Sequence, residues 1–389
     1  MKSTKPDRVV EYSDDLEPNI AASLDRKADN WSEDHYEIKT EKVVEEELVT
    51  FLRHHNVDGE IVDLRRLGGG GSKEQFSFQL GAPGQAPERF VLRVDPKQSA
   101  IETERRREFE ILRAMQGVVP VPAPRWLDAD GQFFATPAVI MSFVDGVTKP
   151  VDRPTGNVSG LGIAFGDGLR ETLANQFVDH LVAVHQFDWR SAELPSFGSP
   201  TADPLQAARW QVNWWARAWH DDKVEPLPTM AVAEQWLRAN LPPCDDPVVV
   251  HGDFRSGNFL FDNSTRKITA VLDWELAHIG DYHQDLAYIL MEALGTRENG
   301  VSYATGLFER EWFLEQYSAR SGRRVDPDRL RYYEILNCYM SIVISLATCV
   351  RAARDGHNHQ DTHVTWIAPL GHILHSELCR MLERGGELQ

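Results

Sequence analysis

A short polar loop that follows an apolar run is the stretch of this sequence best suited to chemistry. The run Val248–Val250 leads into a His-Gly-Asp triplet ending at Asp253, and Asn258 follows five residues later. This spacing is typical of loops that transfer phosphoryl groups, in which the aspartate faces a substrate hydroxyl and the asparagine binds Mg²⁺. Such transfer depends on positioning and charge neutralisation. We therefore predict Asp253 and Arg255 as catalytic residues and Asn258 as a metal ligand.

A second carboxylate follows at a suitable place. Two short strands joined by a turn are expected after Asn258, and if Phe261 pairs with Ile268, then Asn258 lies opposite Val271. Asp273 is two residues further along, on the same face by strand parity. Asn258 and Asp273 would then be two ligands of one Mg²⁺ ion, although a register slip of one residue would separate them. The alternative is that these aspartates are ordinary turn and cap residues.

Four consecutive glycines and a serine lie between two expected strands, 60–67 and 75–80. A loop of this kind offers backbone N–H groups that can cover phosphates. Gly70, Gly71 and Ser72 are therefore candidate nucleotide-binding residues. The loop has neither a Walker A sequence nor a true GxGxxG pattern, so a plain glycine linker is an equally good interpretation.

Phosphoryl transfer also requires a cation on a strand to hold the nucleotide phosphates, oriented by a glutamate on a helix. Arg93 lies in a third expected strand, 89–94, and Glu108 lies in an expected amphipathic helix, 104–115. Arginine keeps its charge and can grip phosphate with two N–H groups. Lys97 is the alternative cation. The competing interpretation is that Arg93 is an exposed edge residue and Glu108 a solvated helix charge.

The order of the elements predicts an α+β fold with two lobes. Residues 1–40 are an acidic N-terminal extension, expected to be a loose arm or a peripheral helix. Residues 41–145 read as a small N-lobe with an antiparallel sheet and one key helix. Residues 146–389 read as a larger, mainly helical C-lobe, with a glycine-rich insertion at 151–168.

Composition excludes several classes of protein. The chain has 389 residues and a formal charge of −18, which argues against a nucleic-acid partner because phosphate backbones bind basic patches. The four cysteines form no CxxC pair, so neither a zinc ribbon nor a redox motif is indicated. We find no signal-like N-terminus and expect a cytoplasmic protein. The longest apolar stretch, Ile335–Val350, reads as a buried helix too short to span a membrane.

The chemistry-bearing region also carries a family resemblance, in the run HGDFRSGNFLF…ITAVLDWELAHIGDYHQDLAY. It resembles the aminoglycoside phosphotransferase and choline kinase superfamily. More narrowly, it resembles the kinase-like domains associated with acyl-CoA dehydrogenases, and the resemblance extends over about residues 43–385. It implies a protein-kinase-like fold, ATP and Mg²⁺ as cofactors, a small-molecule hydroxyl substrate, no membrane and a functional link to an acyl-CoA dehydrogenase.

The resemblance adds residue roles and substrate classes. It implies that Met141 and Phe143 form the hinge whose backbone holds adenine, and that Asp281 and Asp285 brace the catalytic loop. A hydroxyacyl-CoA or related metabolite is the implied acceptor, and Arg351 and Arg354 are candidate residues for its anionic group; they also read as ordinary helix-end charges. Aminoglycosides or amino alcohols are the alternative acceptors. A pseudokinase is the rival class, because the family usually has lysine where this chain has Arg93.

Overall fold

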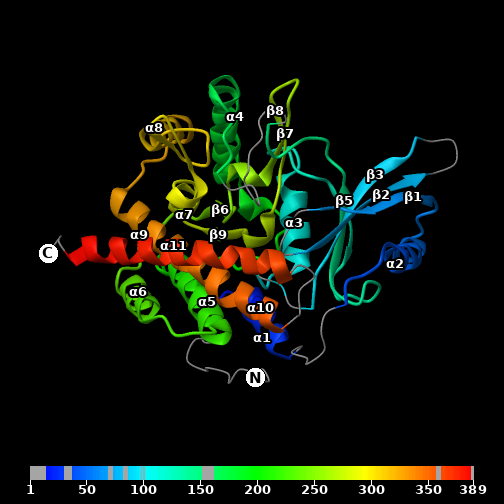
Figure 1. Ribbon diagram of the computed structural model, residues 1–389, viewed down its shortest axis with the longest axis horizontal. Helices are drawn as coiled ribbons and strands as arrows, with labels where there is room; N and C mark the ends of the chain where they lie inside the picture. Colours follow the sequence, from blue (N-terminus) through cyan, green and yellow to red (C-terminus); the bar gives the residue numbers. More distant parts are fainter. Residues whose placement is uncertain are drawn as a thin grey trace.

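The computed structural model consists of a small sheet lobe and a larger helical lobe, arranged side by side (Figure 1). It describes residues 15–29, 37–68, 73–81, 86–97, 99, 101–150, 162–355 and 361–386, with side chains in the last segment described over 367–383.

The small lobe is built on one five-stranded antiparallel sheet with the strand order β1-β2-β3-β5-β4. Side chains alternate along the strands, as in β2, where Phe76 and Phe78 are buried and Ser77 between them is half-buried. Helix α2 lays Val44, Leu48, Phe51 and Leu52 on this apolar face. The strands are β1 Glu60–Arg66, β2 Glu74–Gly81, β3 Glu88–Val94, β4 Pro124–Asp128 and β5 Ala138–Ser142, and α2 is Glu41–His54.

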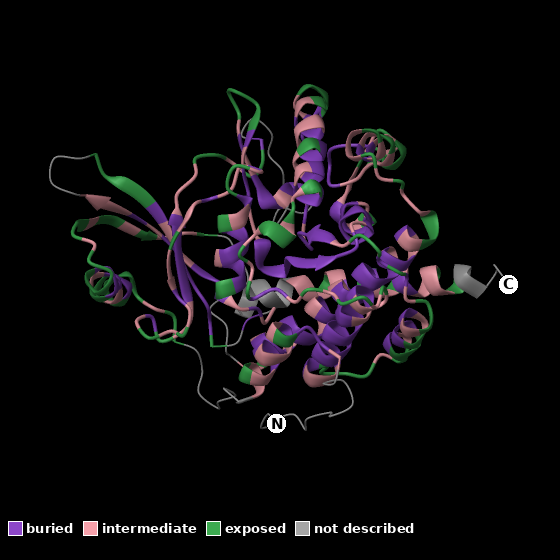
Figure 2. Ribbon diagram, turned by 180° about the vertical axis from the view of Figure 1, so that it is seen from behind, coloured by how far each residue is buried: buried purple, intermediate pink, exposed green. Residues whose placement is uncertain are grey.

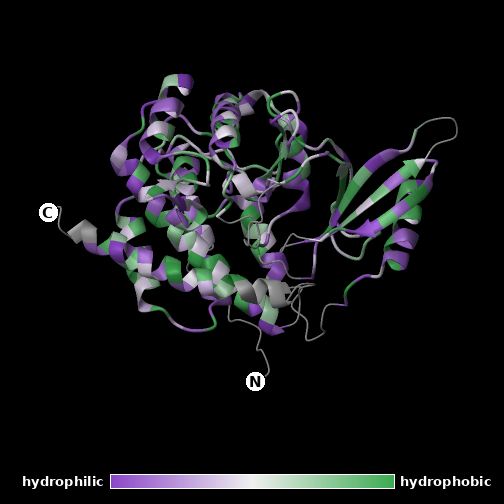
Figure 3. Cartoon of the chain, turned by 45° about the horizontal axis from the view of Figure 1, so that its top comes forward, coloured by the Kyte–Doolittle hydropathy of each residue, from purple (hydrophilic) through white to green (hydrophobic). Residues whose placement is uncertain are grey.

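The large lobe is mainly helical, and its buried residues gather in the interior, where the helices pack against one another (Figure 2). Apolar and polar residues both occur along these helices (Figure 3), and the central helices bury most of their residues. Two short hairpins, β7 with β8 and β10 with β11, carry loops of interest, and β6 pairs with the more distant strand β9. The helices are α4 Asp167–Gln186, α5 Gln206–Asp222, α6 Pro228–Ala239, α7 His283–Ile289, α8 Arg310–Ser321, α9 Pro327–Ile342, α10 Cys349–Asp355 and α11 Asp361–Gly386. The strands are β6 Val248–Val250, β7 Phe259–Asp262, β8 Lys267–Val271, β9 His278–Gly280, β10 Thr296–Glu298 and β11 Val301–Tyr303.

Helix α3 (Arg105–Met115) lies between the sheet and the large lobe (Figure 1). Its apolar residues Ile111, Leu112 and Met115 share one buried cluster with Val139 and Met141 of β5 and with the large-lobe helices, whereas the other face of the sheet and α2 form a separate cluster. The helix also packs on the 3₁₀ turn Trp274–Leu276, which directly follows Asp273. Helix α3 also contacts β4 and β5, so it bridges the sheet and the large lobe.

The longest apolar helix is longer than expected. Helices α9 and α10 are joined through a π-helical segment, Val343–Thr348, into one run over Pro327–Asp355. By length and composition this 29-residue run could cross a membrane, so the prediction that it is too short was wrong. In its most apolar window 78% of the residues are buried inside the protein, as expected of a core helix.

The described part of the N-terminal extension forms helix α1 (Pro18–Asp29), which lies against α5 (Figure 1). Leu16, Ile20 and Leu24, spaced four residues apart, are buried in the large-lobe core. The sequence left open whether this segment is a loose arm or a peripheral helix, and the structure shows a helix over residues 18–29.

Candidate active site

Three of the predicted residues meet in the loop that follows β6. The carboxylate of Asp253 accepts hydrogen bonds from Nε of Arg255 at 2.9 Å and from Nδ2 of Asn258 at 2.6 Å. The hydroxyl of Tyr288, on α7, also hydrogen-bonds to Asp253, and burial together with this carboxylate raises its pKa well above the ordinary value. Tyr288 was not predicted as a site residue. Its hydroxyl keeps its proton and acts as a donor to Asp253.

Asp285, which is fully buried, holds the backbone of this loop through hydrogen bonds. Its two carboxylate oxygens accept the backbone N–H groups of His251 and Gly252, each at 2.8 Å, and one contacts Nε2 of His185 at 3.1 Å. Burial alone would raise the pKa of Asp285, but these hydrogen bonds hold it below the ordinary value. Asp285 thus braces the catalytic loop, whereas Asp281 accepts Nδ1 of His283 at 2.7 Å, outside this loop.

His251 is a structural member of the loop. One ring nitrogen, Nε2, lies 3.0 Å from the carbonyl oxygen of Leu272, and Nδ1 accepts the backbone N–H of Asp253 at 3.2 Å. Burial lowers the pKa of this imidazole, so it remains neutral with Nε2 protonated. Gly252 has φ +83°, and a Cβ atom there would lie 2.9 Å from the carbonyl oxygen of Leu276. Only glycine fits this turn.

The hairpin β7–β8 carries Asn258 and Asp273 at its open end, with one correction to the predicted register. Phe261 pairs with Ile268 as expected, but a bulge shifts the pairing so that Phe259, not Asn258, lies opposite Val271. The extra residue is Thr269, whose hydroxyl donates to the carbonyl oxygen of Asp145 at 2.8 Å.

As a result of the bulge, Asn258 accepts the backbone N–H of Leu272 at 2.7 Å, directly beside Asp273. Asp273 itself has a left-handed conformation, with φ +65° and ψ +53°. Such conformations are uncommon outside glycine and are found at functional sites, where the surrounding structure enforces them. The two predicted metal ligands therefore lie next to each other across the open end of the hairpin, through a different pairing from the one predicted.

Arg93 is placed at the centre of the site. It is 7% exposed, and its guanidinium donates to Glu108 through Nη1 and to Asp273 through Nη2 at 2.9 Å. Burial alone would lower its pKa, but Glu108, Asp273 and Glu275 outweigh burial and raise the pKa. The same contact lowers the pKa of Asp273, against the effect of its own burial. Lys97 is exposed and lies beyond the end of β3.

Four further charged residues, none of them among the predicted site residues, surround this pair: Lys73, Asp95, Arg105 and Glu275. Arg105, fully buried on α3, donates to Glu108 and contacts Asp95 at 2.9 Å and Glu275 at 3.1 Å. Lys73 lies 3.4 Å from Asp95 and 3.7 Å from Glu275. Glu275 is thus held by cations, and burial raises its pKa. A sequence signal was available in Arg105, because cations are disfavoured in the first turn of a helix.

The junction between the lobes holds the two predicted hinge residues. Met141 is buried in β5 and pairs with Val91. The backbone N–H of Phe143 donates to the carbonyl oxygen of Arg89 at 2.9 Å, and the Arg89 guanidinium lies 4.4 Å from the centre of its ring. The remaining nucleotide-binding predictions, Gly70, Gly71 and Ser72, lie outside the described residues.

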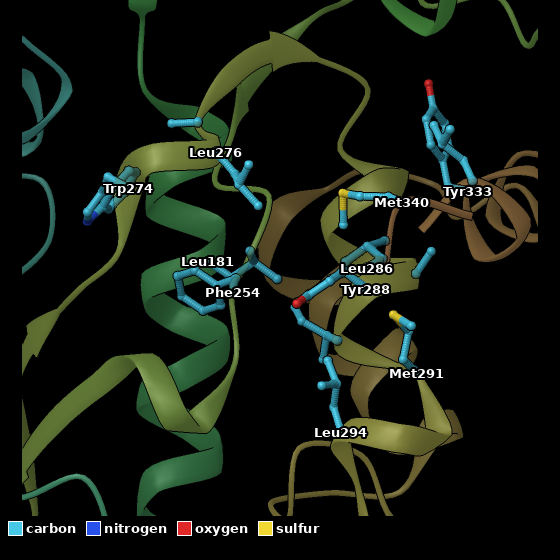
Figure 4. Close-up of a cluster of buried hydrophobic side chains, with 14 of the residues drawn as sticks. Leu181, Phe254, Trp274, Leu276, Leu286, Tyr288, Met291, Leu294, Tyr333 and Met340 are labelled. Carbon is cyan, nitrogen blue, oxygen red and sulfur yellow. The ribbon is translucent and has the colours of Figure 1, made fainter. Parts of the chain in front are cut away.

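The catalytic loop rests on a buried apolar cluster (Figure 4). Phe254, next to Asp253, lies beside Leu181 of α4 and packs edge-on against Phe177, with ring centres 4.6 Å apart. The ring of Tyr288 belongs to the same cluster. The loop is therefore fixed by hydrogen bonds on one side and by aromatic packing on the other.

The two arginines considered for an acyl-CoA anion are both paired. Arg351 is 6% exposed and its Nε lies 2.7 Å from Asp222, and Arg354 lies 2.9 Å from Asp355. Burial in this ion pair leaves Arg351 poorly exposed to an acyl-CoA anion, whereas the side chain of Arg354 is 49% exposed and its role stays a prediction.

Together, the sheet lobe with its Arg–Glu pair and the helical lobe with its catalytic loop define a protein-kinase-like phosphotransferase. Residues 63–321 match the phosphotransferase enzyme family (APH), which is more than half of the chain, and the chain belongs to this family. The family resemblance inferred from the catalytic segment is thereby confirmed.

Curated relatives include proteins named as acyl-CoA dehydrogenases. Acyl-CoA dehydrogenase family member 11 of Gallus gallus is 31% identical over 232 residues, which are 58% of this chain and 27% of that protein. The probable acyl-CoA dehydrogenase IBR3 of Arabidopsis thaliana is 26% identical over 300 residues, 72% of this chain and 35% of that protein. The chain thus spans about a quarter to a third of the length of these relatives.

Solved structures with the same fold are phosphotransferases. A candidate aminoglycoside phosphotransferase from Ralstonia eutropha superposes with a TM-score of 0.61 at 24% identity, covering 86% of this chain and 98% of that one. Aminoglycoside phosphotransferase APH(4)-Ia, in complex with AMP-PNP and hygromycin B, has a TM-score of 0.54 at 18% identity, covering 84% and 97%. These similarities confirm the predicted two-lobed fold.

We expect Asp285→Asn to destabilise the protein strongly, because one buried carboxylate satisfies two backbone N–H groups and a histidine. Loss of such a group costs about 2–5 kcal/mol of unfolding free energy. The depressed pKa means that this contribution is complete above the ordinary value of 3.8 and is lost as pH falls through the folded-state pKa. Urea unfolding at pH 7 should show the full difference, and the difference should shrink below about pH 4.

Asp246→Asn is the matched control, since the side chain of Asp246 is 66% exposed and its ion pair with Arg323 lies at the surface. It should cost no more than about 1 kcal/mol. Equal losses in the two variants, or a loss at Asp285 that does not change with pH, would contradict the bracing role.

Proposed function

We propose that this protein is an ATP- and Mg²⁺-dependent kinase that phosphorylates a hydroxyl group of a small molecule. The observation that carries the proposal is the state of Asp253, whose carboxylate is oriented by Arg255 and Asn258 yet has a side chain 18% exposed. A carboxylate that is held in one orientation and is still reachable suits a group that receives an acceptor hydroxyl.

The residues available for Mg²⁺ fit that ion. Nδ2 of Asn258 donates to Asp253, so the amide oxygen is on the opposite side and remains a ligand atom. The side chain of Asp273 is 35% exposed and its lowered pKa keeps it ionised. Hard oxygen atoms of this kind are what Mg²⁺ prefers. When bound, the ion would neutralise charge on the nucleotide phosphates and orient them.

The chain's own residues supply the rest of the reaction. Asp253 orients the acceptor hydroxyl and accepts its proton as the hydroxyl oxygen bonds to the γ-phosphorus and the bond to the bridging oxygen breaks, which releases ADP. Arg255, whose guanidinium contacts Asp253, is placed to stabilise the transferred group. Arg93, fixed by Glu108, holds the phosphates. The AMP-PNP found in APH(4)-Ia supports a nucleotide in the corresponding cleft.

The acceptor we propose is a hydroxylated acyl thioester or a related carboxylic metabolite. Its support is the similarity to relatives named acyl-CoA dehydrogenase family member 11 and IBR3, with which a functional link would follow. The net charge of −18 would favour a polycationic acceptor at long range, as in the aminoglycoside phosphotransferases. The acceptor class is therefore the part of the proposal that an experiment must decide.

The two aspartates should fail in different ways. Asp253→Asn should reduce turnover by about 10²–10⁴-fold, the usual effect of losing a general base, and leave Mg·AMP-PNP binding nearly intact. Asp273→Ala should abolish the Mg²⁺ dependence of nucleotide binding in calorimetry. Asp262→Asn is the control and should leave both turnover and Mg·AMP-PNP binding unchanged. Asp262 lies on the same hairpin but caps its turn, where it accepts the backbone N–H of Ser264. Normal turnover by Asp253→Asn, or unchanged Mg·AMP-PNP affinity in Asp273→Ala, would refute the respective role.

Of the two candidate cations, only Arg93 should matter for the nucleotide. Arg93→Ala should raise the KM for ATP at least tenfold, because about 1.4 kcal/mol of lost phosphate binding already has that effect. Lys97→Ala should leave the KM within twofold of wild type, since Lys97 is exposed beyond the strand. A larger effect at Lys97 would show that the phosphate-binding cation has been placed wrongly.

For the acceptor, the purified protein should be incubated with ATP and two panels of compounds, hydroxyacyl-CoAs and aminoglycosides, with products followed by mass spectrometry. We expect a mass increase of one phosphoryl group on hydroxyacyl-CoAs, absent with Asp253→Asn. Efficient phosphorylation of aminoglycosides without any of hydroxyacyl-CoAs would reject the acceptor class and keep the kinase. Mg·ATP binding without turnover on any hydroxylated compound would instead identify a pseudokinase.

A further inference from the structure

We propose that Glu17, which precedes the part of the chain matched by the family, is a positioning residue for the active site. Through Arg107 it fixes the rotation of helix α3, and so keeps Glu108 directed at Arg93. This inference rests on the proposed function only in taking Arg93 to be the residue that holds the nucleotide phosphates.

Glu17 is a buried carboxylate whose partners belong to other parts of the fold. It is 4% exposed, and its two oxygens accept from Nη1 of Arg107 and from Nη2 at 3.3 Å. The backbone N–H of Gly198 also donates to it, at 2.6 Å. A charge-assisted pair with two donors from one guanidinium defines orientation as well as distance. The segment before α1 is thus tied to α3 by a specific contact.

Arg107 extends this contact towards the catalytic centre. It is 2% exposed and donates to the carbonyl oxygens of Ser196 at 2.6 Å and Ala277 at 3.0 Å, and its guanidinium lies 4.2 Å from the ring centre of Phe197. Ala277 follows the 3₁₀ turn that begins directly after Asp273. Arg107 therefore fastens α3 to the segment that carries the proposed metal ligand.

The position of Arg107 on the helix determines what this fastening controls. Successive residues of an α-helix are about 100° apart, so Arg107 and Glu108 point in different directions from the axis. With Arg107 held against the large lobe, α3 cannot rotate, and Glu108 stays at Arg93. Without Glu17, Arg107 would be a buried cation, and Glu110, at i+3 on α3, is a carboxylate at a spacing that allows contact.

Glu110 is already engaged, because its carboxylate accepts the backbone N–H and the hydroxyl of Ser196, each at 2.9 Å. Removal of Glu17 therefore sets Arg107 in competition with Ser196 for Glu110. The hydrogen bonds that Ser196 makes to Glu110 would then weaken or break. The predicted consequence is a rotation or shift of α3 that loosens the Glu108–Arg93 pair.

The chain offers a matched control on the same segment. Asp25, on α1, contacts Arg217 of α5 at 2.6 Å and so also fastens this segment to the large lobe. This ion pair joins α1 to α5 and does not involve α3. Asp25→Asn therefore weakens the docking of α1 without touching the path from Glu17 to Glu108.

The test is calorimetric titration of the full chain with Mg·AMP-PNP and, separately, with adenosine. We expect Glu17→Gln to raise the Kd for Mg·AMP-PNP by about fivefold or more, a typical coupling between sites, and to leave the Kd for adenosine unchanged. The selectivity follows because Arg93 would meet phosphates and not the nucleoside. Asp25→Asn should leave both dissociation constants unchanged.

Arg107→Lys is the second variant, used if Glu17→Gln does not fold. It keeps the buried charge but loses the planar fork that reaches Ser196 and Ala277, and it should show the same phosphate-selective loss. Equal weakening of Mg·AMP-PNP and adenosine in a folded variant, or the same loss in Asp25→Asn, would overturn the positioning role. A wild-type protein that fails to bind Mg·AMP-PNP would instead overturn the proposed function, on which this inference rests.

Discussion

The guanidinium of Arg93 is the group on which the rest of the site depends, because it joins parts of the fold that are far apart in sequence. It lies on β3, binds Glu108 on α3 and binds Asp273, which follows 180 residues later. A planar fork can serve two carboxylates at once in fixed directions, whereas an ammonium acts as a point charge. Arginine in place of the family's usual lysine is therefore compatible with an assembled site.

The cost of this arrangement is a concentration of buried charge, which is stable only if the charges are paired. The carboxylates outnumber the cations by one, and burial raises the pKa of Glu275 within the cluster. An excess of negative charge around Asp273 is what a divalent cation would offset. The cations are Lys73, Arg93 and Arg105, and the carboxylates are Asp95, Glu108, Asp273 and Glu275.

The parts of this site that sequence reasoning predicted are those encoded by local spacing. Asp253, Asn258 and the strand position of Arg93 follow from short patterns, and the structure brings them together. The bulge at Thr269 could not be predicted, because its cause is a hydrogen bond to Asp145 in the linker between the lobes. Strand β4 was missed for a local reason, since the prolines around it argue against a strand.

The position of α3 could not be predicted from the sequence either, because it depends on contacts with residues far away in the chain. Its partners Glu17 and Ala277 lie 90 and 170 residues away, and nothing in the helix sequence identifies them. The apolar residues of α3 pack both against β5 and in the core of the large lobe. The Arg93–Glu108 pair therefore joins the sheet to the helix that bridges the two lobes. Any movement of β3 relative to α3 must break this pair or carry both residues along, so whatever fixes α3 also limits how far β3 can move while Arg93 keeps its contact with Glu108.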